Sequence, residues 1–369
     1  MTQSFIYQLG IGVINTSDLD NIITSSTINI PLISLGYHYY FLKTQNDFNE
    51  IIKSNKDLYY IINPFEHIIS NYEDNLKNLT KHYLNIKDDK PDILSQDFYK
   101  IWEIIFLFDL LNSNNMDIKI IANDDDYNVI ENTILKFKQK LLSIDINFKK
   151  NKTNYNLIIA SEKYNINEGD NYKIFFNEII IALQTQQKDG SFVVKIGETF
   201  TIPTLKLIYL LSCLYEETYI YKPSFSRLNE NEKYIVCKKY KKIDIKIKPL
   251  EKILEEMNTK HYCQDIFPSL MLPFEFIAKF KFINTKLVNM QYVMTNKMIT
   301  YIKENNYFGE KYHIYKEAQI VATKWWVGNY YPPSNNLYEK NKTDLKLLFN
   351  DNLKYYQAES EKFILTLIY

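Results

Sequence analysis

Charged side chains stand at the ends of predicted strands between residues 188 and 240. The strand-forming run Ser191–Val194 leads directly to Lys195, a later strand ends at Lys222, and Glu232 opens another strand. Open α/β sheets gather their chemistry at the carboxyl ends of strands. A positioned lysine whose pKa is lowered by burial can take a proton from a poorly nucleophilic hydroxyl, and a carboxylate can orient that lysine. Lys195 and Glu232 are therefore candidates for proton-transfer chemistry.

The elements around these residues alternate between strand and helix. Apolar residues at helical spacing predict a helix from Gln96 to Leu111. Buried strands are predicted at Ile118–Ala122 and Asn156–Ala160, and helices at Val129–Leu142 and Tyr172–Gln186 follow them. This alternation predicts βαβ units and a largely parallel sheet.

The pattern changes after residue 241. Helices are predicted at Pro249–Met257, Phe274–Phe282 and Thr285–Asn305, with no clear strand among them. We therefore expect three parts: an N-terminal appendage (1–95), an α/β core (96–241) and a helical C-terminal extension (242–369).

Two motifs of the core carry a resemblance to a known family. The run G-S-F-V-V-K ends at Lys195, and the pattern K-P-x-x-S-R-x-x-x-x-E-x-Y begins at Lys222. Their order and separation resemble the C-terminal half of FtsJ-type RNA ribose 2′-O-methyltransferases. The resemblance implies a Rossmann-like methyltransferase sheet, here partly truncated in its cofactor half.

The resemblance also implies catalytic residues. The family uses a Lys–Asp–Lys–Glu constellation, in which the second lysine is the base. Lys100 resembles the first lysine, Lys195 matches the second and Glu232 matches the glutamate. Taken singly, each could be an ordinary solvated charge. The surrounding pattern favours the catalytic interpretation for Lys195 and Glu232, whereas for Lys100 the two interpretations are balanced.

The expected aspartate is missing. An ungapped match places Ser161 at its position, and a one-residue slip would let Glu162 supply a longer carboxylate. Serine cannot replace the negative charge that holds a pair of lysines together. We therefore take Glu162 as the candidate carboxylate.

The cofactor that the resemblance implies is S-adenosylmethionine, which needs a glycine-rich turn for close backbone approach. No glycine lies between Gly36 and Gly169. The best-placed segment contains Ala122, Asn123 and Asp124, where carboxylates would repel the methionine carboxylate of the cofactor. Two alternatives for these acids are capping of a helix N-terminus and a hard-cation site. No other residues have metal-ligand spacing, so no metal is expected.

The composition allows RNA binding only through a local patch. The chain carries 44 basic and 44 acidic side chains, so no global field draws it to nucleic acid. By resemblance, Arg227, Lys222 and Ser226 would contact RNA, with capped mRNA as the expected substrate. Aromatic residues near Trp325 could stack on bases, although packing onto the sheet is the commoner role. No apolar run approaches the length of a membrane span.

Two functional hypotheses follow. The first is an RNA cap ribose 2′-O-methyltransferase of a large DNA virus, weak or inactive because the glycine turn and the aspartate are absent. The second is a pseudo-enzyme that serves as an RNA-binding or regulatory subunit beside a protein partner. Either would work in the host cytoplasm, in a viral factory, or in the virion.

Overall fold

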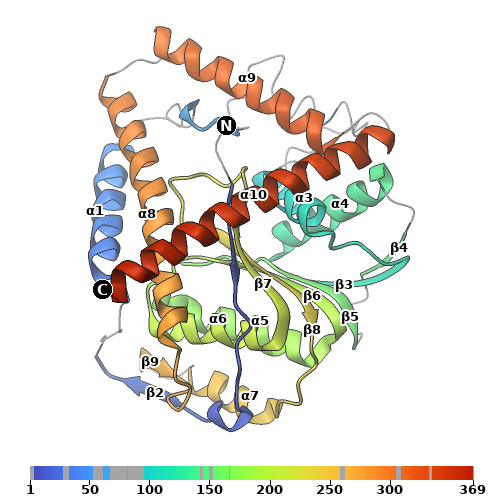
Figure 1. Ribbon diagram of the computed structural model, residues 1–369, viewed down its shortest axis with the longest axis vertical. Helices are drawn as coiled ribbons and strands as arrows, with labels where there is room; N and C mark the ends of the chain where they lie inside the picture. The colour runs from blue at the N-terminus through green and yellow to red at the C-terminus, as the bar shows by residue number, and fades with distance from the viewer. Residues whose placement is uncertain are drawn as a thin grey trace.

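A seven-stranded mixed sheet organises the chain (Figure 1). The computed structural model describes residues 4–27, 33–52, 61–66, 81, 95–141, 144–148, 153–165, 167–257, 262–304, 309–331 and 335–368. The sheet order is β1-β7-β8-β6-β5-β3-β4. The strands are β1 (Phe5–Leu9), β3 (Asn115–Ile121), β4 (Asp145–Asn147), β5 (Tyr155–Ala160), β6 (Gln186–Ile196), β7 (Tyr215–Lys222) and β8 (Lys233–Tyr240).

The pairing within the sheet confirms the predicted α/β fold. Strands β4, β3, β5 and β6 are parallel, while β8 runs antiparallel between β6 and β7. The helix α4 (Asp124–Leu141) connects β3 to β4, and α5 (Tyr172–Thr185) connects β5 to β6. The arrangement is Rossmann-like, and β4 at its edge is only three residues long.

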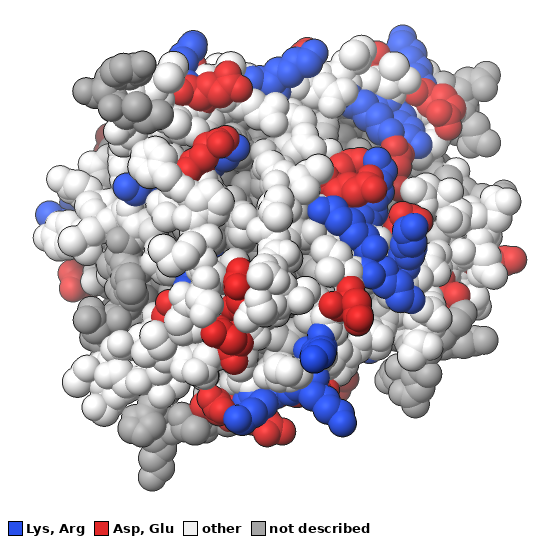
Figure 2. All heavy atoms as spheres, turned by 60° about the horizontal axis from the view of Figure 1, so that its bottom comes forward, with Lys and Arg blue, Asp and Glu red and all other residues white. Residues whose placement is uncertain are grey.

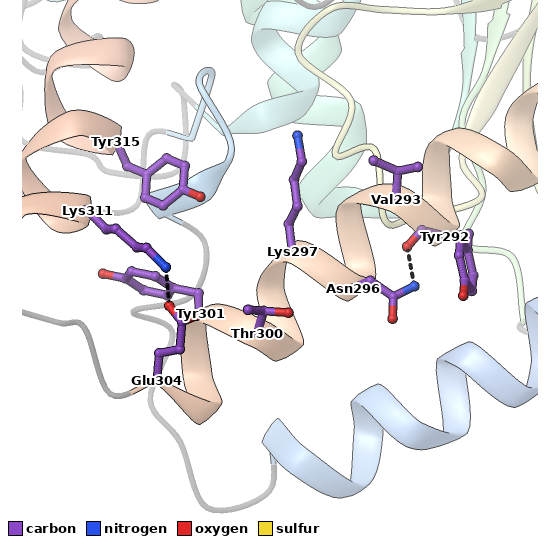
Figure 3. Close-up of a pocket in the computed structure, with 9 residues that line it drawn as sticks. All are labelled: Tyr292, Val293, Asn296, Lys297, Thr300, Tyr301, Glu304, Lys311 and Tyr315. Carbon is purple, nitrogen blue, oxygen red and sulfur yellow. Dashed lines mark hydrogen bonds and ion pairs between the residues drawn. The ribbon is translucent and has the colours of Figure 1, made fainter.

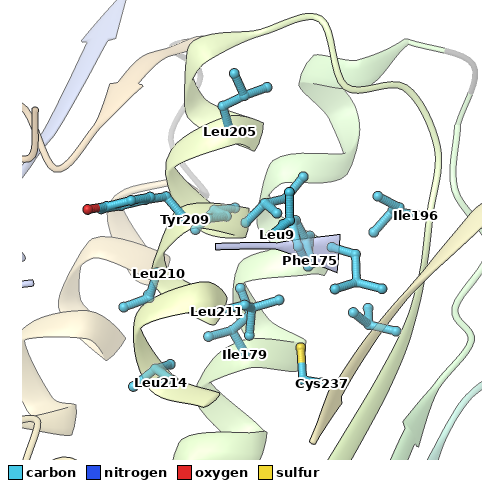
Figure 4. Packing of buried hydrophobic residues seen from close by; sticks show 14 of the residues in the cluster. Leu9, Phe175, Ile179, Ile196, Leu205, Tyr209, Leu210, Leu211, Leu214 and Cys237 are labelled. Carbon is cyan, nitrogen blue, oxygen red and sulfur yellow. The ribbon is translucent and has the colours of Figure 1, made fainter. Parts of the chain in front are cut away.

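Helices cover both faces of the sheet. On one face, α3 (Gln96–Phe108) and α4 pack in a core that includes Trp102, Ile130 and Val193. On the other, α5 and α6 (Ile202–Leu214) form a second core, part of which is drawn in Figure 4. Successive strand residues point to opposite faces, so both cores are built by the same strands.

The C-terminal extension is helical, as predicted, and wraps around the core. Its helices are α7 (Ile247–Glu256), α8 (Phe274–Lys303), α9 (Glu310–Tyr330) and α10 (Asn335–Ile368). In Figure 1, α10 crosses the face that bears α3. The hydroxyl of Tyr7 in β1 donates to Ser360 Oγ of α10 at 3.0 Å, so the last helix is attached to the first strand.

Two sequence predictions for the C-terminal extension were wrong, and one helix near the N-terminus was not predicted. One unbroken helix, α8, replaces the two expected helices, because the polar Asn284 within it is buried and hydrogen-bonded to Thr199. The extension also contains a strand, β9 (Tyr262–Ile266), which pairs with the distant β2 (Ile22–Ser25). The helix α1 (Leu35–Ile52), which was not predicted, packs against α8.

The N-terminal segment contributes to the core sheet. Strand β1 pairs antiparallel with β7, with Phe5 opposite Lys222. The division at residues 95 and 241 stays a prediction, but β1 shows that the first residues of the chain complete the sheet of the core. The short 3-10 helices Thr16–Asp18 and Glu168–Asn171 lie in connecting segments.

Candidate active site

The candidate site lies at the edge of the sheet where β3, β5, β6 and β7 end. Because β4 and β5 flank β3 on opposite sides, the strand order reverses there, which is where open α/β sheets bind ligands. Strand β8 is antiparallel and begins at the same edge, with Lys233 opposite Ile196. The structure thereby brings the ends of five strands together.

Lys100 and Glu232, 132 positions apart in the sequence, meet as an ion pair. Lys100 Nζ lies 2.6 Å from Glu232 Oε1 and 3.1 Å from Asp97 Oδ1. The lysine side chain is 3% exposed. Burial alone would lower the pKa of Lys100, but the carboxylates of Glu232 and Asp97 outweigh it and raise the pKa above the ordinary value. Lys100 is therefore a fixed cation that orients Glu232.

Lys195 lies on the same side of the sheet as this pair. It sits opposite Tyr234 in the β6–β8 ladder, and Glu232 precedes Tyr234 by two residues. Val193, two residues before Lys195, packs in the core with α3. Since residues two apart share a face, Lys195 projects toward the face that carries α3. The hydroxyl of Tyr234 is buried there with no hydrogen-bond partner among the described residues.

Hydrogen bonds from a buried lysine hold the loop that carries Glu232. The buried ammonium of Lys222 donates to the carbonyl oxygens of Glu230 (2.7 Å) and Glu232 (2.8 Å). Burial lowers the pKa of Lys222 to about 8, against the attraction of the nearby carboxylates. The hydroxyl of Ser226 donates to Glu232 Oε1 at 3.3 Å. In this structure Lys222 and Ser226 position Glu232, and their contact with RNA stays a prediction.

Arg227 is engaged by acidic partners. Its Nε donates to Glu66 Oε2 at 2.8 Å, and its Nη1 donates to Glu230 Oε1 at 3.0 Å. The side chain is 12% exposed. The guanidinium thus ties the loop to residues 61–66, and contact of Arg227 with RNA also stays a prediction.

The position of the missing aspartate is filled by a small buried hydroxyl. Ser161 follows β5, is 1% exposed, and its Oγ has no partner among the described residues. Glu162 is half-buried, and its charge raises the pKa of Tyr164 and Glu178. Glu162 therefore faces the α5 side of this edge, and its predicted catalytic role stays untested.

Sequence reasoning missed the buried carboxyl group of Glu178 in α5. Its side chain is fully buried and accepts a hydrogen bond from the Tyr164 hydroxyl at 2.7 Å. Burial raises the pKa of Glu178 to about 8, although the charge of Lys195 partly opposes that rise. A glutamate on an apolar helix gives no local sign that it will be enclosed beneath a strand end.

The turn after β3 is a helix cap. Asn123 Oδ1 accepts from the backbone N–H of Asp126 at 2.9 Å, and Asn123 Nδ2 donates to Asp126 Oδ2 at 2.9 Å. Only Ala122 and Asn123 separate the strand from α4, whose first turn contains three aspartates. The capping side chain is thus Asn123, and the three aspartates lie in the first turn of α4, where negative charge is stabilising.

These residues do not fit S-adenosylmethionine as a glycine-rich turn would. Each position bears a side chain, and the amide of Asn123 is already used by Asp126. The carboxylates of Asp124 and Asp125 are exposed in the same segment, and negative charge disfavours the binding of an anionic group. Cofactor binding by Ala122, Asn123 and Asp124 stays a prediction that this geometry disfavours.

Glu103 is a second buried carboxyl group that sequence reasoning missed. It lies one turn after Lys100 in α3 and accepts from Trp326 Nε1 (2.9 Å), Ser224 N (2.9 Å) and the Tyr221 hydroxyl (3.2 Å). Burial raises its pKa to about 7, although these donors favour the charged form. Glu103 thus joins α3, the end of β7 and α9 directly behind the Lys100–Glu232 pair.

The distribution of charge agrees with a local rather than a global site. In the view of Figure 2, lysine and arginine side chains lie interspersed with aspartate and glutamate. Within the described part of the chain, no three His, Cys, Asp or Glu side chains are grouped to hold a metal ion. No helix among the described residues is long and apolar enough to cross a membrane.

Comparison with known proteins identifies the core. Residues 99–240 match the FtsJ-like methyltransferase family. A cap-specific mRNA (nucleoside-2′-O-)-methyltransferase 2 of Drosophila melanogaster is 26% identical over 160 residues, covering 42% of this chain and 22% of the fly protein. The chain therefore spans only about a fifth of that relative.

Two viral proteins are also similar. An uncharacterized protein of Acanthamoeba polyphaga mimivirus is 24% identical over 301 residues, which cover 73% of this chain and 80% of the viral protein. A probable methyltransferase of African swine fever virus is 32% identical over 128 residues, which cover 35% of this chain and 28% of that protein. The mimivirus alignment extends well beyond the core into the flanking regions.

Proposed function

Since residues 99–240 of this chain belong to the FtsJ-like methyltransferase family, we propose that the protein binds RNA at the carboxyl edge of its sheet and transfers methyl groups weakly or not at all. The observation that carries this proposal is the 2.6 Å Lys100–Glu232 pair, which lies at the same edge of the sheet as the strand end that bears Lys195. The names of the cap-specific relatives suggest capped mRNA as the RNA.

In the proposed site, each retained residue has a task toward a ribose hydroxyl. The amine of Lys195 takes a proton from the hydroxyl, or its ammonium donates a hydrogen bond to the hydroxyl oxygen. Glu232 is held by Lys100 and Ser226, so that its carboxylate presents a fixed negative charge beside the same hydroxyl. These residues position the ribose without assistance from the cofactor half.

The residues at the expected cofactor turn and at the expected aspartate position support weak or absent methyl transfer. The capped turn at Asn123 offers no glycine, and Ser161 replaces the carboxylate of the constellation. S-adenosylmethionine would supply the methyl group if it were bound. Because the residues here do not fit it, we assign no step of the reaction to this chain.

A second candidate function is that of a pseudo-enzyme within a viral RNA-processing complex. The Asn123 cap and the Ser161 hydroxyl favour it, since neither supplies a group that the family uses for methyl transfer. In that case a protein partner would supply methyl transfer, and this chain would hold RNA or regulate the partner. We place either form in the host cytoplasm or in the virion.

Calorimetric titration with S-adenosylmethionine separates a chain that transfers methyl groups weakly from a pseudo-enzyme. No heat at millimolar cofactor, combined with RNA binding that Lys195→Ala weakens, would support the pseudo-enzyme. Micromolar binding that Ala122→Trp abolishes would instead show a working cofactor site, and methylation of capped RNA by wild type and Lys195→Ala should then be compared. Failure of the protein to bind RNA would overturn the first candidate and the RNA-holding form of the second.

A further inference from the structure

A surface pocket of about 360 Å³ lies in the angle between α8 and α9, outside the site described above (Figure 3). This volume falls within the range of small-ligand pockets. The inner face of α8 contacts the loop after Lys195 through Asn284 and Thr199, whereas its outer face lines the pocket. The lining residues are Tyr292, Val293, Asn296, Lys297, Thr300, Tyr301, Glu304, Lys311 and Tyr315.

Three tyrosines supply the aromatic part of the pocket. Tyr292 is 49% exposed at one end, and the half-buried Tyr315 projects from α9 at the other. Tyr301, 2% exposed, meets Tyr315 edge-to-face with ring centroids 5.6 Å apart. A phenol ring offers a flat apolar face, on which every nucleobase can stack.

The charged residues favour an anionic ligand. Lys311 is neutralised by Glu304, with which it forms an ion pair across the α8–α9 connection. Lys297 is exposed and has no ion-pair partner among the described residues. Figure 3 shows its ammonium extending from α8 between the two tyrosine-bearing ends. The charged residues of the lining are two lysines and one glutamate, so the lining has one excess positive charge, which Lys297 carries.

Polar groups between the tyrosines can read the edge of a base. Asn296 Nδ2 donates to the Tyr292 carbonyl oxygen at 2.8 Å, which fixes the amide and leaves its Oδ1 as an acceptor. The exposed Thr300 is one turn farther along α8 and contributes a hydroxyl that can donate or accept. The pocket therefore combines aromatic faces, one unpaired cation and hydrogen-bonding groups of both kinds.

A shared apolar cluster connects the pocket to the candidate active site. Beneath it, Met294, Met298 and Tyr301 form an apolar cluster. Leu228 packs against the same cluster and directly follows Arg227 in the loop that carries Glu232. A ligand on the outer face of α8 would thus contact the apolar cluster against which the loop that carries Glu232 also packs.

We propose that this pocket binds one nucleotide of a single-stranded RNA, with its base against Tyr292 or Tyr315 and its phosphate at Lys297. The proposal rests on the proposed function, because it extends the RNA path from the sheet edge to the C-terminal extension. Stacking gives affinity with little sequence preference, and the lysine gives a single salt-sensitive contact.

Binding of a short fluorescein-labelled RNA oligonucleotide tests the proposal. Tyr292→Ala should weaken binding by roughly fivefold or more, as loss of a base-stacking ring does. Lys297→Ala should reduce the slope of log K against log salt by about 0.7, the value for one phosphate contact on a single strand. Matched controls are Tyr355→Ala, a tyrosine 51% exposed on α10, and Lys252→Ala, 77% exposed on α7. Both controls should bind as wild type does.

Titration with guanosine monophosphate distinguishes failure of this inference from failure of the proposed function. If RNA binding persists unchanged in Tyr292→Ala and Lys297→Ala, the pocket assignment is overturned while RNA binding at the sheet edge stands. If RNA does not bind but the mononucleotide binds and Tyr292→Ala abolishes that binding, the pocket is a site for a free nucleotide, and both its assignment to RNA and the proposed function fail. Equal binding of single-stranded DNA would overturn the assignment to RNA, and equal affinity for an acidic peptide would overturn the assignment to a nucleotide.

Discussion

At the scale of single residues, the Lys100–Glu232 pair is both a candidate catalytic element and a stability element. Lys100 is almost wholly enclosed, so its charge must be compensated inside the protein. Asp97 supplies a second carboxylate at 3.1 Å. Removal of the Glu232 carboxylate leaves Asp97 to compensate the charge of Lys100.

A double-mutant cycle of Lys100→Met and Glu232→Gln measures the pair. We expect a coupling energy of about 2 kcal/mol from chemical unfolding, since each single variant removes an opposite charge from an enclosed or partly enclosed group. The control is the exposed pair Lys252–Glu256, 3.8 Å apart, for which coupling should be below about 0.5 kcal/mol. Equal coupling in the two pairs would mean that the Lys100–Glu232 site is solvated.

Glu178 predicts a pH dependence of stability. Its folded pKa of about 8 lies above the ordinary value of 4.5, so the folded state holds the proton more tightly than the unfolded state. The stabilisation is complete below the unfolded pKa and is lost as the pH rises through the folded pKa. Between these pH values the Glu178 carboxyl lowers the unfolding free energy by about 1.4 kcal/mol per pH unit.

Glu178→Gln removes this titration while keeping a hydrogen-bond acceptor for Tyr164. Relative to wild type, the variant should gain stability at pH 8 and not at pH 5, as measured by denaturant unfolding across that range. Tyr164→Phe is the companion variant, because loss of the donor at 2.7 Å should raise the pKa of Glu178 further. Parallel stability profiles for wild type and Glu178→Gln would contradict the assignment.

At the scale of elements, the C-terminal extension is attached where the loop that carries Glu232 begins. Trp326 of α9 donates to Glu103 of α3, and Glu103 also accepts from the backbone of Ser224 in that loop. The neighbouring Trp325 lies partly buried on the same core, with no such bond to Glu103. The two tryptophans therefore form a natural comparison.

Trp326→Phe should destabilise the protein by about 1–3 kcal/mol, because a buried carboxylate loses a donor while the ring is largely retained. Trp325→Phe on the same helix turn should cost less than about 1 kcal/mol. Thermal unfolding of the two variants compares them directly. A similar loss in both would assign the effect to aromatic packing rather than to the hydrogen bond.

At the scale of the whole molecule, the equal numbers of basic and acidic side chains limit the electrostatic part of RNA binding. With 44 of each, affinity must come from stacking and a few phosphate contacts. We expect a slope of log K against log salt of about −2, equivalent to roughly three contacts at 0.7 each. A slope steeper than about −5 in fluorescence anisotropy titrations would reveal a basic surface that a local site does not provide.

Much of the core could be predicted because its signals are local. The helix of Lys100, the strands before Ala122 and Ser161, and the strand ending near Lys195 follow from apolar periodicity over short windows. The pairing of β2 with β9 could not be predicted, since each strand becomes regular only by hydrogen bonding to a segment more than 200 residues away. The same holds for the enclosure of Glu103 and Glu178, which depends on what packs over them.

The sequence by itself determined the resemblance of residues 99–240 to the FtsJ-like methyltransferase family, the residues at the predicted strand ends and the absence of a glycine turn, because fixed spacing and residue type are local properties. Only the tertiary structure decided that Lys100 pairs with Glu232, that Lys222 is turned inward, and that Asn123 caps a helix. These interactions form because folding brings the polar groups within a few ångströms of one another. Burial is a property of the packed chain, because the elements that enclose each residue are remote in the sequence.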